Sequence, residues 1–339
     1  MAAASRFGRM PDGTEIEEVT ISAGDLSANI ITLGAVIRDI RLAGIDHALV
    51  LGFDTLEDYL AYSPHFGAMV GRSANRIADG RFAIDGHEYQ LERNEGGRTH
   101  LHGGKNGFGS IPWRLVDHDG ASATLALTSP DGDEGYPGRV EVTCRYAIEA
   151  PATFRFEVTA TTDAPTIVNL AQHSYFNLDA SDDILDHEVQ VFADAYTPVN
   201  DALVPTGEIR SVDGTDYDLR TMRPIRRMVD GKRFQYDVNM VVAMEQAAEP
   251  RPVARLHSPK NGVTLAVHST EPGVQFYDGN MMKTIPVPGL DGQRYALSSG
   301  CCFEPQFFPD APNHPNFAST VLRPGGTYRQ ATFYRFSRD

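Results

Sequence analysis

Short runs in which apolar and polar residues alternate recur along most of the chain. Clear examples are residues 15–21, 122–128 and 154–162, which are rich in β-branched and aromatic side chains. Alternation with a period of two is typical of strands that bury one face. Similar runs follow at residues 28–33, 35–42, 140–148, 188–192, 254–256, 263–268, 274–277 and 327–336. Regularly spaced strands predict an all-β protein, either a sandwich or a barrel.

Little of the sequence favours helix. Residues 56–60 form the best short helix candidate, with Thr55 as its N-cap. Residues 81–91 predict a hairpin whose turn is Asp85-Gly86. No repeat of fixed period and no low-complexity linker interrupts the chain. We therefore expect residues 1–339 to form a single β-domain.

Composition and charge narrow the possible partners and location. The formal net charge of −15 argues against nucleic acids and anionic membrane surfaces as partners. No apolar run is long enough for a transmembrane helix, and residues 1–9 lack the apolar core of a secretory signal. The odd, low count of three cysteines fits a reducing cytoplasm, where we expect the protein to reside. Cys301 and Cys302 are interpreted as small buried apolar residues.

The stretch QHSYFNL at residues 172–178 combines several polar side chains at the end of an apolar run. It follows residues 166–170, which read as a buried strand. A histidine held at a strand end, here His173, is suited to donating and accepting protons near neutral pH. A lone histidine is also compatible with a satisfied core position.

A second candidate is Glu304, which lies inside the apolar and aromatic run CCFEPQFFPD at residues 301–310. Glutamate is rarely buried without a partner or a function. Burial raises a carboxyl pKa toward values useful to a general base. Glu304 is therefore the residue least expected to be inert.

Further polar clusters have both functional and structural readings. His100 and His102 are two apart, so in a strand they would face the same side and enter a site together or ligate a metal. The segment at residues 71–80 supplies amide and guanidinium donors suited to sugar hydroxyls. A surface turn, an exposed loop acid or an amide bonded to the backbone would explain these residues equally well: Asn75, Arg76, Asp237 and Gln275.

Ordered motifs over nearly the whole chain resemble the aldose 1-epimerase (galactose mutarotase) family. They are GRSANRI at residues 71–77, LHGG at 101–104, SPDGDEGYPG at 129–138, HSYFNL at 173–178, YTPVN at 196–200, PTGEI at 205–209, PGVQFYDGN at 272–280 and FEPQFFPDAPNHP at 303–315, together with Gly107, Phe108 and Trp113. The chain departs from the family pattern at Val238, where histidine is frequent, and at Ala171-Gln172, where Thr-Asn is frequent.

The resemblance implies a large antiparallel β-sandwich, the galactose mutarotase-like supersandwich, with very little helix and an open sugar cleft. It implies Glu304 as general base and His173 as general acid in opening and closing the ring of a free monosaccharide, with no cofactor and no metal. It further implies sugar contacts by Asn75, Arg76, His102, Tyr175, Asp237 and Gln275.

Three other functions remain open from the sequence. A cupin-like metalloenzyme would use His100, His102 and Glu304 as a two-histidine, one-carboxylate triad. A non-catalytic sugar-binding module would share the fold without the chemistry. A glycosidase would use the carboxyl groups of Glu304 and Asp237.

The two proposed catalytic groups also predict a pH dependence. Burial should raise the pKa of Glu304, and nearby carboxylates such as Asp237 should raise that of His173. We therefore expect a plateau near neutrality, with an alkaline limb above the ordinary histidine value of about 6.5.

Overall fold

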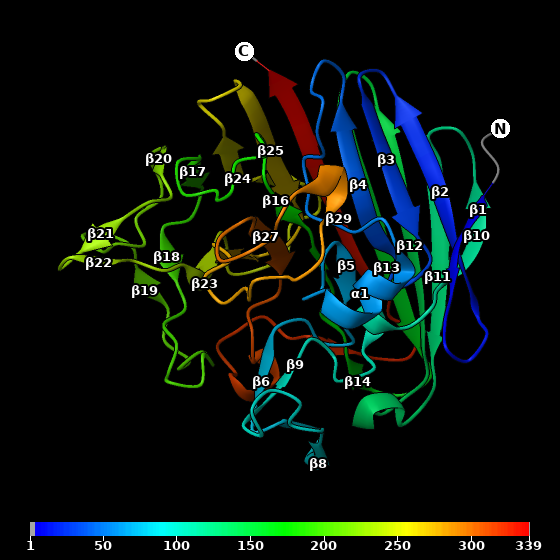
Figure 1. Cartoon of the computed structure of the whole chain (residues 1–339). Coiled ribbons are helices and arrows are strands. Elements are labelled where there is room, and N and C mark those ends of the chain that lie inside the picture. Colours follow the sequence, from blue (N-terminus) through cyan, green and yellow to red (C-terminus); the bar gives the residue numbers. More distant parts are fainter. Residues whose placement is uncertain (1–3, 339) are drawn as a thin grey trace.

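Three antiparallel sheets of four or more strands dominate the computed structural model, which describes residues 4–338 (Figure 1). The four-stranded sheet consists of β1 (Ser5–Arg9), β2 (Glu15–Ala23), β3 (Leu26–Ile31) and β4 (Val36–Leu42). The nine-stranded sheet runs in the order β10 (Arg114–His118), β11 (Ser122–Ser129), β12 (Val140–Glu149), β13 (Thr153–Thr162), β29 (Tyr328–Arg338), β25 (Val263–Ser269), β24 (Arg251–His257), β17 (Glu188–Val191) and β20 (Arg223–Pro224).

The six-stranded sheet carries much of the candidate site. Its order is β16 (Tyr175–Phe176), β27 (Cys301–Gln306), β26 (Gly273–Tyr277), β23 (Asp237–Val241), β18 (Ala195–Tyr196) and β19 (Arg210–Ser211). Shorter pairs complete the fold: β5 (Ala68–Val70) with β15 (Ala171–His173), β6 (Arg76–Ala78) with β9 (Thr99–Leu101), β7 (Arg81–Ile84) with β8 (His87–Gln90), β14 (Thr166–Ile167) with β28 (Val321–Leu322), and β21 (Met228–Val229) with β22 (Lys232–Arg233).

One apolar core joins the three large sheets. Phe154, Phe156 and Val158 alternate with polar residues along β13 and are fully buried, as the period of two requires. They share a continuous cluster with Ile37 of the four-stranded sheet and Phe276 of the six-stranded sheet. The predicted antiparallel β-sandwich is therefore confirmed.

The predicted local elements are confirmed as well. The helix α1 spans Leu56–Tyr62, and the Thr55 side chain accepts a hydrogen bond from the Asp58 backbone N–H at its start. In the turn between β7 and β8, Asp85 and Gly86 have φ angles of 53° and 80°, as a tight hairpin turn requires. Single turns of 3₁₀ helix lie at Phe108–Ser110, Asp133–Gly135, Leu290–Gly292 and Ala311–Asn313. No helix among the described residues is long and apolar enough to cross a membrane.

Two neighbouring strands place the polar and apolar sides of the candidate site. In the β26–β27 register, Gln275 lies opposite Glu304, and Phe276 lies opposite Phe303. The two phenylalanine rings stack at 5.2 Å inside the core. Because successive side chains point to opposite faces of a sheet, Gln275 and Glu304 lie on the other face, which lines a cavity.

Candidate active site

A cavity of about 480 Å³ opens beside the six-stranded sheet, a volume within the usual range of ligand pockets. All of the site residues predicted from the sequence line it, although they come from widely separated parts of the chain. All of them except the half-buried Asp237 are buried. The residues are Asn75, Arg76, His102, His173, Tyr175, Asp237, Gln275 and Glu304.

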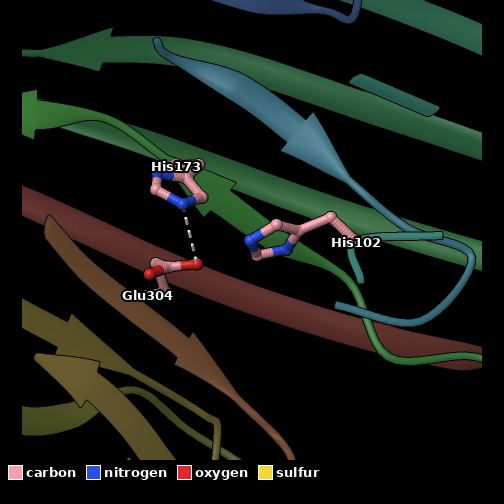
Figure 2. Close-up of side chains that lie close together, drawn as sticks. All are labelled: His102, His173 and Glu304. Atoms are coloured by element: carbon pink, nitrogen blue, oxygen red, sulfur yellow. Dashed lines mark ion pairs between the residues drawn. The ribbon is translucent and has the colours of Figure 1, made fainter. Parts of the chain in front are cut away.

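The carboxyl group of Glu304 faces the imidazole ring of His173, and both line the cavity. Its Oε2 atom lies 3.5 Å from Nε2 of His173, and the dashed line in Figure 2 marks this ion pair. Only 2% of Glu304 is exposed, and Oε2 has no hydrogen-bond partner among the described residues. Burial raises the pKa of Glu304 to about 8, the Asp237 charge adds to the rise, and Arg76 opposes it.

His173 is the last residue of β15, and its ring stacks on two other aromatic rings. The Tyr175 ring stacks on it at 5.1 Å, and the His65 ring stacks at 5.8 Å. Nδ1 lies 3.5 Å from Sγ of Cys302, which is therefore more than the apolar filler expected from the sequence. Burial raises the Cys302 pKa well above its ordinary value, so the thiol stays protonated and its sulfur can accept the Nδ1–H of the neutral imidazole. That tautomer leaves Nε2 as the unprotonated nitrogen, which faces Glu304 and can accept its proton.

The expected rise in the pKa of His173 is wrong. Burial, with a smaller contribution from the neighbouring His65, lowers that pKa to about 3. Removing the charged imidazolium from water costs more free energy than the surrounding carboxylates return. In the protein without sugar, the pKa of the intended acid is therefore below that of the intended base.

His100 and His102 do not face the same side, so that prediction is wrong too. The strand β9 ends at Leu101, and His102 adopts a φ of +52°, which breaks the strand alternation. His100 points away from the cavity: Nδ1 lies 2.8 Å from the Glu92 carbonyl, and Nε2 lies 2.7 Å from the Tyr136 hydroxyl. His102 lines the cavity instead, with Nδ1 accepting the Asn75 backbone N–H at 3.2 Å. The proton of neutral His102 therefore lies on Nε2.

The metal triad of His100, His102 and Glu304 does not form, because His100 is bonded elsewhere. His102, His173 and Glu304 each offer one possible ligand atom, and these atoms lie within 4.8 Å of one another. Zinc bonds of about 2.0–2.1 Å place tetrahedral ligand atoms only about 3.4 Å apart. The cluster thus has suitable donors, but its side chains would have to move inward to hold a metal ion.

A charged network lines the cavity beside Glu304. Nε and Nη2 of Arg76 each donate to a carboxylate oxygen of Glu95 at 2.8 Å. Nη1 of Arg76 lies 3.6 Å from Oδ2 of Asp237, and the Gln275 amide donates to Oδ1 of Asp237 at 2.6 Å. Oδ2 of Asp237 and Oε1 of Gln275 accept no hydrogen bond from the described residues. They are acceptors that sugar hydroxyls can satisfy.

Other parts of the recognised motifs support the site without lining the cavity. The buried Arg72 donates to the carbonyls of Pro137 and Gly138 at 2.8 and 2.9 Å, which ties the SPDGDEGYPG loop to GRSANRI. A Cβ on Gly103 would lie 1.8 Å from the Gly71 carbonyl oxygen, so this position of LHGG requires glycine. These residues fix the backbone that presents Asn75 and His102.

The two departures from the family pattern also lie outside the cavity lining. Val238 is on the core face of β23, opposite Phe276. The Gln172 amide donates to the Gly67 carbonyl at 2.6 Å, and its oxygen accepts the Ser174 backbone N–H at 2.9 Å. Two residues that do line the cavity, Glu95 and His65, are not predicted by any motif. Their nearness to the site arises only from the tertiary fold.

Comparison with known proteins agrees with this geometry. The family model described as aldose 1-epimerase matches residues 17–335. Galactose mutarotase from Bos taurus is 40% identical over 98% of this chain and 97% of its own. Aldose 1-epimerase from Escherichia coli (strain K12) is 32% identical over 96% of each chain.

Solved structures show the same likeness. An aldose epimerase homologue from C. elegans has a TM-score of 0.88 and 30% identity, over 95% of this chain and 98% of its own. Galactose 1-epimerase from Lactobacillus acidophilus has a TM-score of 0.84 at 24% identity, which supports the fold alone, over 100% of this chain and 99% of its own. The resemblance seen in the motifs is thus confirmed along the whole length, and the chain belongs to the aldose 1-epimerase family.

Proposed function

We propose that this protein interconverts the α and β anomers of free aldoses, with Glu304 as general base and His173 as general acid. Membership of the aldose 1-epimerase family supports the reaction. The observation that supports the roles is the 3.5 Å contact between Oε2 of Glu304 and Nε2 of His173, both facing one cavity. A base and an acid so placed can serve neighbouring oxygens of one sugar ring.

The chemistry follows from the structure of a pyranose, which is a cyclic hemiacetal. Glu304 takes the proton of the C1 hydroxyl while His173 gives a proton to the ring oxygen, and the C1–O5 bond breaks. Rotation about C1–C2 presents the other face of the open aldehyde. The same two groups, with reversed roles, then close the ring as the other anomer. Each positioned acid or base contributes on the order of 10²–10⁴ in rate.

Glu304 and His173 together carry one exchangeable proton, as a reaction with one acid and one base requires. Because the pKa of His173 is lowered to about 3 and that of Glu304 is raised to about 8, the pair holds one proton across the neutral range. Burial places this proton on Glu304 before sugar binds. Its transfer to His173 across the 3.5 Å contact yields the carboxylate and imidazolium that ring opening uses, without exchange with solvent.

The remaining cavity residues bind and polarise the sugar in this proposal. Arg76 and the Nε2–H of His102 stabilise negative charge that develops on sugar oxygens. Asn75, Asp237 and Gln275 bond to hydroxyl groups. The Tyr175 hydroxyl donates to the Pro64 carbonyl at 3.1 Å, so Tyr175 offers the sugar its ring.

Polarimetry of freshly dissolved α-anomers of several aldoses tests the reaction. We expect equilibration faster than the uncatalysed rate, without added metal or nucleotide, and an unchanged rate after dialysis against a chelator. Binding without acceleration would instead indicate a sugar-binding module, and release of an alcohol from a glycoside would indicate a glycosidase. A rate that chelation abolishes and a metal ion restores would overturn the metal-free mechanism.

We further propose that residues 1–339 act as one domain in the cytoplasm, with a monosaccharide as partner and no nucleic acid. The cluster of core residues that extends from Val19 to Phe336 supports the single domain. The free, buried Cys144, Cys301 and Cys302 support a reducing compartment. Cell fractionation with an antibody to the protein tests the location.

A further inference from the structure

His65 lies in the cavity wall between α1 and β5, beside His102 and His173. Its ring centroid is 4.9 Å from that of His102 and 5.8 Å from that of His173. Within residues 4–338, neither ring nitrogen of His65 hydrogen-bonds to another side chain or to the backbone. The polar edge of this imidazole is therefore available to a ligand in the cavity.

The backbone at His65 adopts a conformation that non-glycine residues rarely use. Its φ is +70°, in the left-handed region, where a Cβ crowds the following carbonyl. Two other cavity residues share this conformation, Asn75 with a φ of 59° and His102 with a φ of 52°. Both are proposed sugar contacts. Strained residues cluster at binding sites when the surrounding structure holds them in place, and His65 fits that pattern.

Several contacts hold His65 in place. The Ser63 hydroxyl accepts the Phe66 backbone N–H at 2.9 Å, and the Tyr175 hydroxyl donates to the Pro64 carbonyl at 3.1 Å. The Phe66 side chain is fully buried, with its ring 5.0 Å from that of Tyr175. The turn that carries His65 is thus fixed on both sides of the residue.

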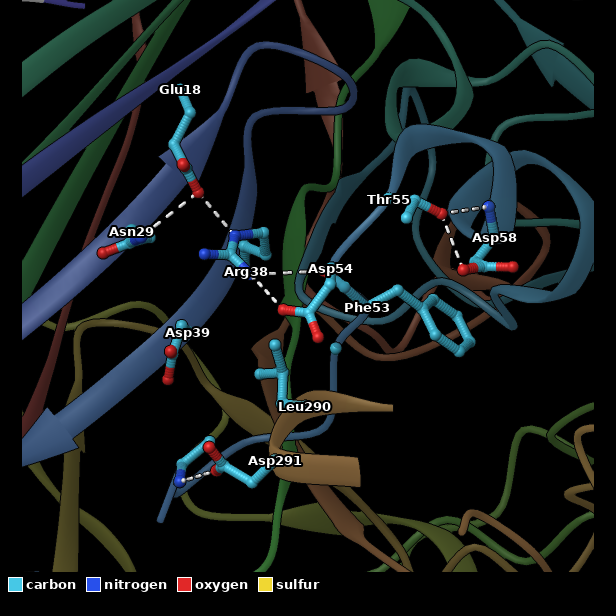
Figure 3. Close-up of polar contacts among 12 residues, drawn as sticks. Glu18, Asn29, Arg38, Asp39, Phe53, Asp54, Thr55, Asp58, Leu290 and Asp291 are labelled. Atoms are coloured by element: carbon cyan, nitrogen blue, oxygen red, sulfur yellow. Dashed lines mark hydrogen bonds and ion pairs between the residues drawn. The ribbon is translucent and has the colours of Figure 1, made fainter. Parts of the chain in front are cut away.

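The helix that precedes this turn is anchored as well (Figure 3). Arg38 of β4 forms ion pairs with Glu18 of β2 and with Asp54, which lies just before α1. Thr55 then caps the helix by accepting the Asp58 backbone N–H at 3.2 Å. These contacts join α1 to the four-stranded sheet, and so they set the position from which the His65 turn begins.

We propose that His65 hydrogen-bonds the substituent at C5 of the aldose and thereby selects hexoses over 6-deoxyhexoses and pentoses. This inference rests on the proposed function, in which His173 serves the ring oxygen and Glu304 serves the C1 hydroxyl. The ring oxygen is bonded to C1 and C5. His65 contacts His173 and His102, and no hydrogen bond or ion pair among the described residues joins it to Glu304. The stacking of His65 on His173, which serves the ring oxygen, is the basis on which we place His65 on the C5 side of that oxygen.

The chemistry of the imidazole suits a hydroxymethyl group. Burial lowers the pKa of His65 to about 4, so the ring is neutral at pH 7. Neutral imidazole has one N–H donor and one nitrogen acceptor, which match a hydroxyl that both donates and accepts. A 6-deoxy sugar keeps the carbon and loses the hydroxyl, and a pentose loses both.

The test compares kcat and KM for D-galactose, 6-deoxy-D-galactose and L-arabinose, which share their configuration from C1 to C4. The matching glucose series is D-glucose, 6-deoxy-D-glucose and D-xylose. His65→Asn tolerates a positive φ but has a shorter side chain, and His65→Phe keeps a ring without polar atoms. Loss of one hydrogen bond should lower kcat/KM about 3- to 10-fold more for the hexose than for the other two sugars, mainly through KM.

His87→Asn, at an exposed histidine of β8, is the matched control, and thermal unfolding checks that each variant folds. Protection against unfolding by saturating hexose and 6-deoxyhexose gives a second readout that needs no turnover. Equal losses for all three sugars would assign His65 a structural role and overturn the proposal, as would unchanged kinetics. A wild-type protein that epimerises neither series would instead overturn the proposed function.

Discussion

Two glutamates near β26, Glu271 and Glu304, are similarly buried but differ in their contacts. Glu271 precedes β26 and is 0% exposed, while Glu304 on β27 is 2% exposed. Burial raises the pKa of Glu271 to about 7 and that of Glu304 to about 8. Oε1 of Glu271 accepts hydrogen bonds from the Gln246 amide at 2.7 Å and from the Thr270 hydroxyl at 3.3 Å. Glu304 accepts none from the described residues.

This difference shows that burial and a raised pKa do not by themselves mark a catalytic carboxyl group. Neutral donors satisfy Oε1 of Glu271, while its Oε2, like that of Glu304, has no partner among the described residues; Glu271 does not line the cavity. The lone pairs of Glu304 remain available, and the polar group that forms an ion pair with it is His173. We therefore assign Glu304 a reactive role and Glu271 a structural one.

The largest expected effect separates the two glutamates directly. Glu304→Gln is nearly isosteric and should lower kcat on the order of 10²-fold or more, because the amide cannot accept the C1 proton. Glu271→Gln, the matched control, should leave kcat close to wild type, since Glu271 does not line the cavity. Polarimetry of both variants measures this contrast. Similar losses in the two would contradict the assignment.

The second prediction concerns His173, which forms an ion pair with Glu304. His173→Asn removes the proton donor to the ring oxygen, and we expect kcat to fall on the order of 10²-fold. The sugar should still protect this variant against thermal unfolding, because the binding residues remain. A variant that keeps more than about a tenth of the wild-type rate would show that another group supplies the proton.

The third prediction is a pH profile of kcat/KM for the sugar-free enzyme. The active pair carries one proton, and above pH 8 Glu304 loses it, so the alkaline limb should lie near pH 8. Asp237 raises the pKa of Glu304, so Asp237→Asn should move this limb to lower pH. Glu271→Gln should not move it. A limb that stays in place in Asp237→Asn would contradict the assignment to Glu304.

The last prediction concerns stability and not catalysis. The folded-state pKa of Glu271, about 7, is above its ordinary value of 4.5, so the folded protein binds this proton more tightly than the unfolded chain does. The resulting stability is fully present below pH 4.5 and is lost as pH rises through 7, by up to about 3 kcal/mol. Glu271→Gln should flatten unfolding free energy against pH in this window. A slope identical to that of wild type would contradict the raised pKa.

Much of the fold and site was predictable because local patterns determine them. Alternation along β13 and the Asp85-Gly86 turn predict strands and a hairpin from neighbouring residues alone. The aromatic run around Glu304 predicts its burial, since flanking residues such as Phe303 must face the core.

Other features depend on contacts that no local pattern contains. His102 has a left-handed backbone conformation, which breaks the strand alternation, so its side chain does not face the same side as that of His100. The direction of the His173 pKa shift depends on how completely the folded chain excludes water. Glu95 enters the site through its pairing with Arg76, and His65 through the turn after α1. Neither the Glu95–Arg76 ion pair nor the position of His65 can be predicted from sequence spacing.

Some cavity residues lie on paired strands and others lie in loops, and this difference affects how easily substrate selectivity can evolve. Glu304 and Gln275 stand on paired strands, whereas His65, Asn75 and His102 stand on left-handed loop residues around them. Strand pairing fixes the position of Glu304 relative to Gln275, and loops tolerate substitution without disturbing a sheet. Libraries confined to the lining residues 61–65 and 281–283 can therefore change substrate selectivity while Glu304 and His173 stay in place.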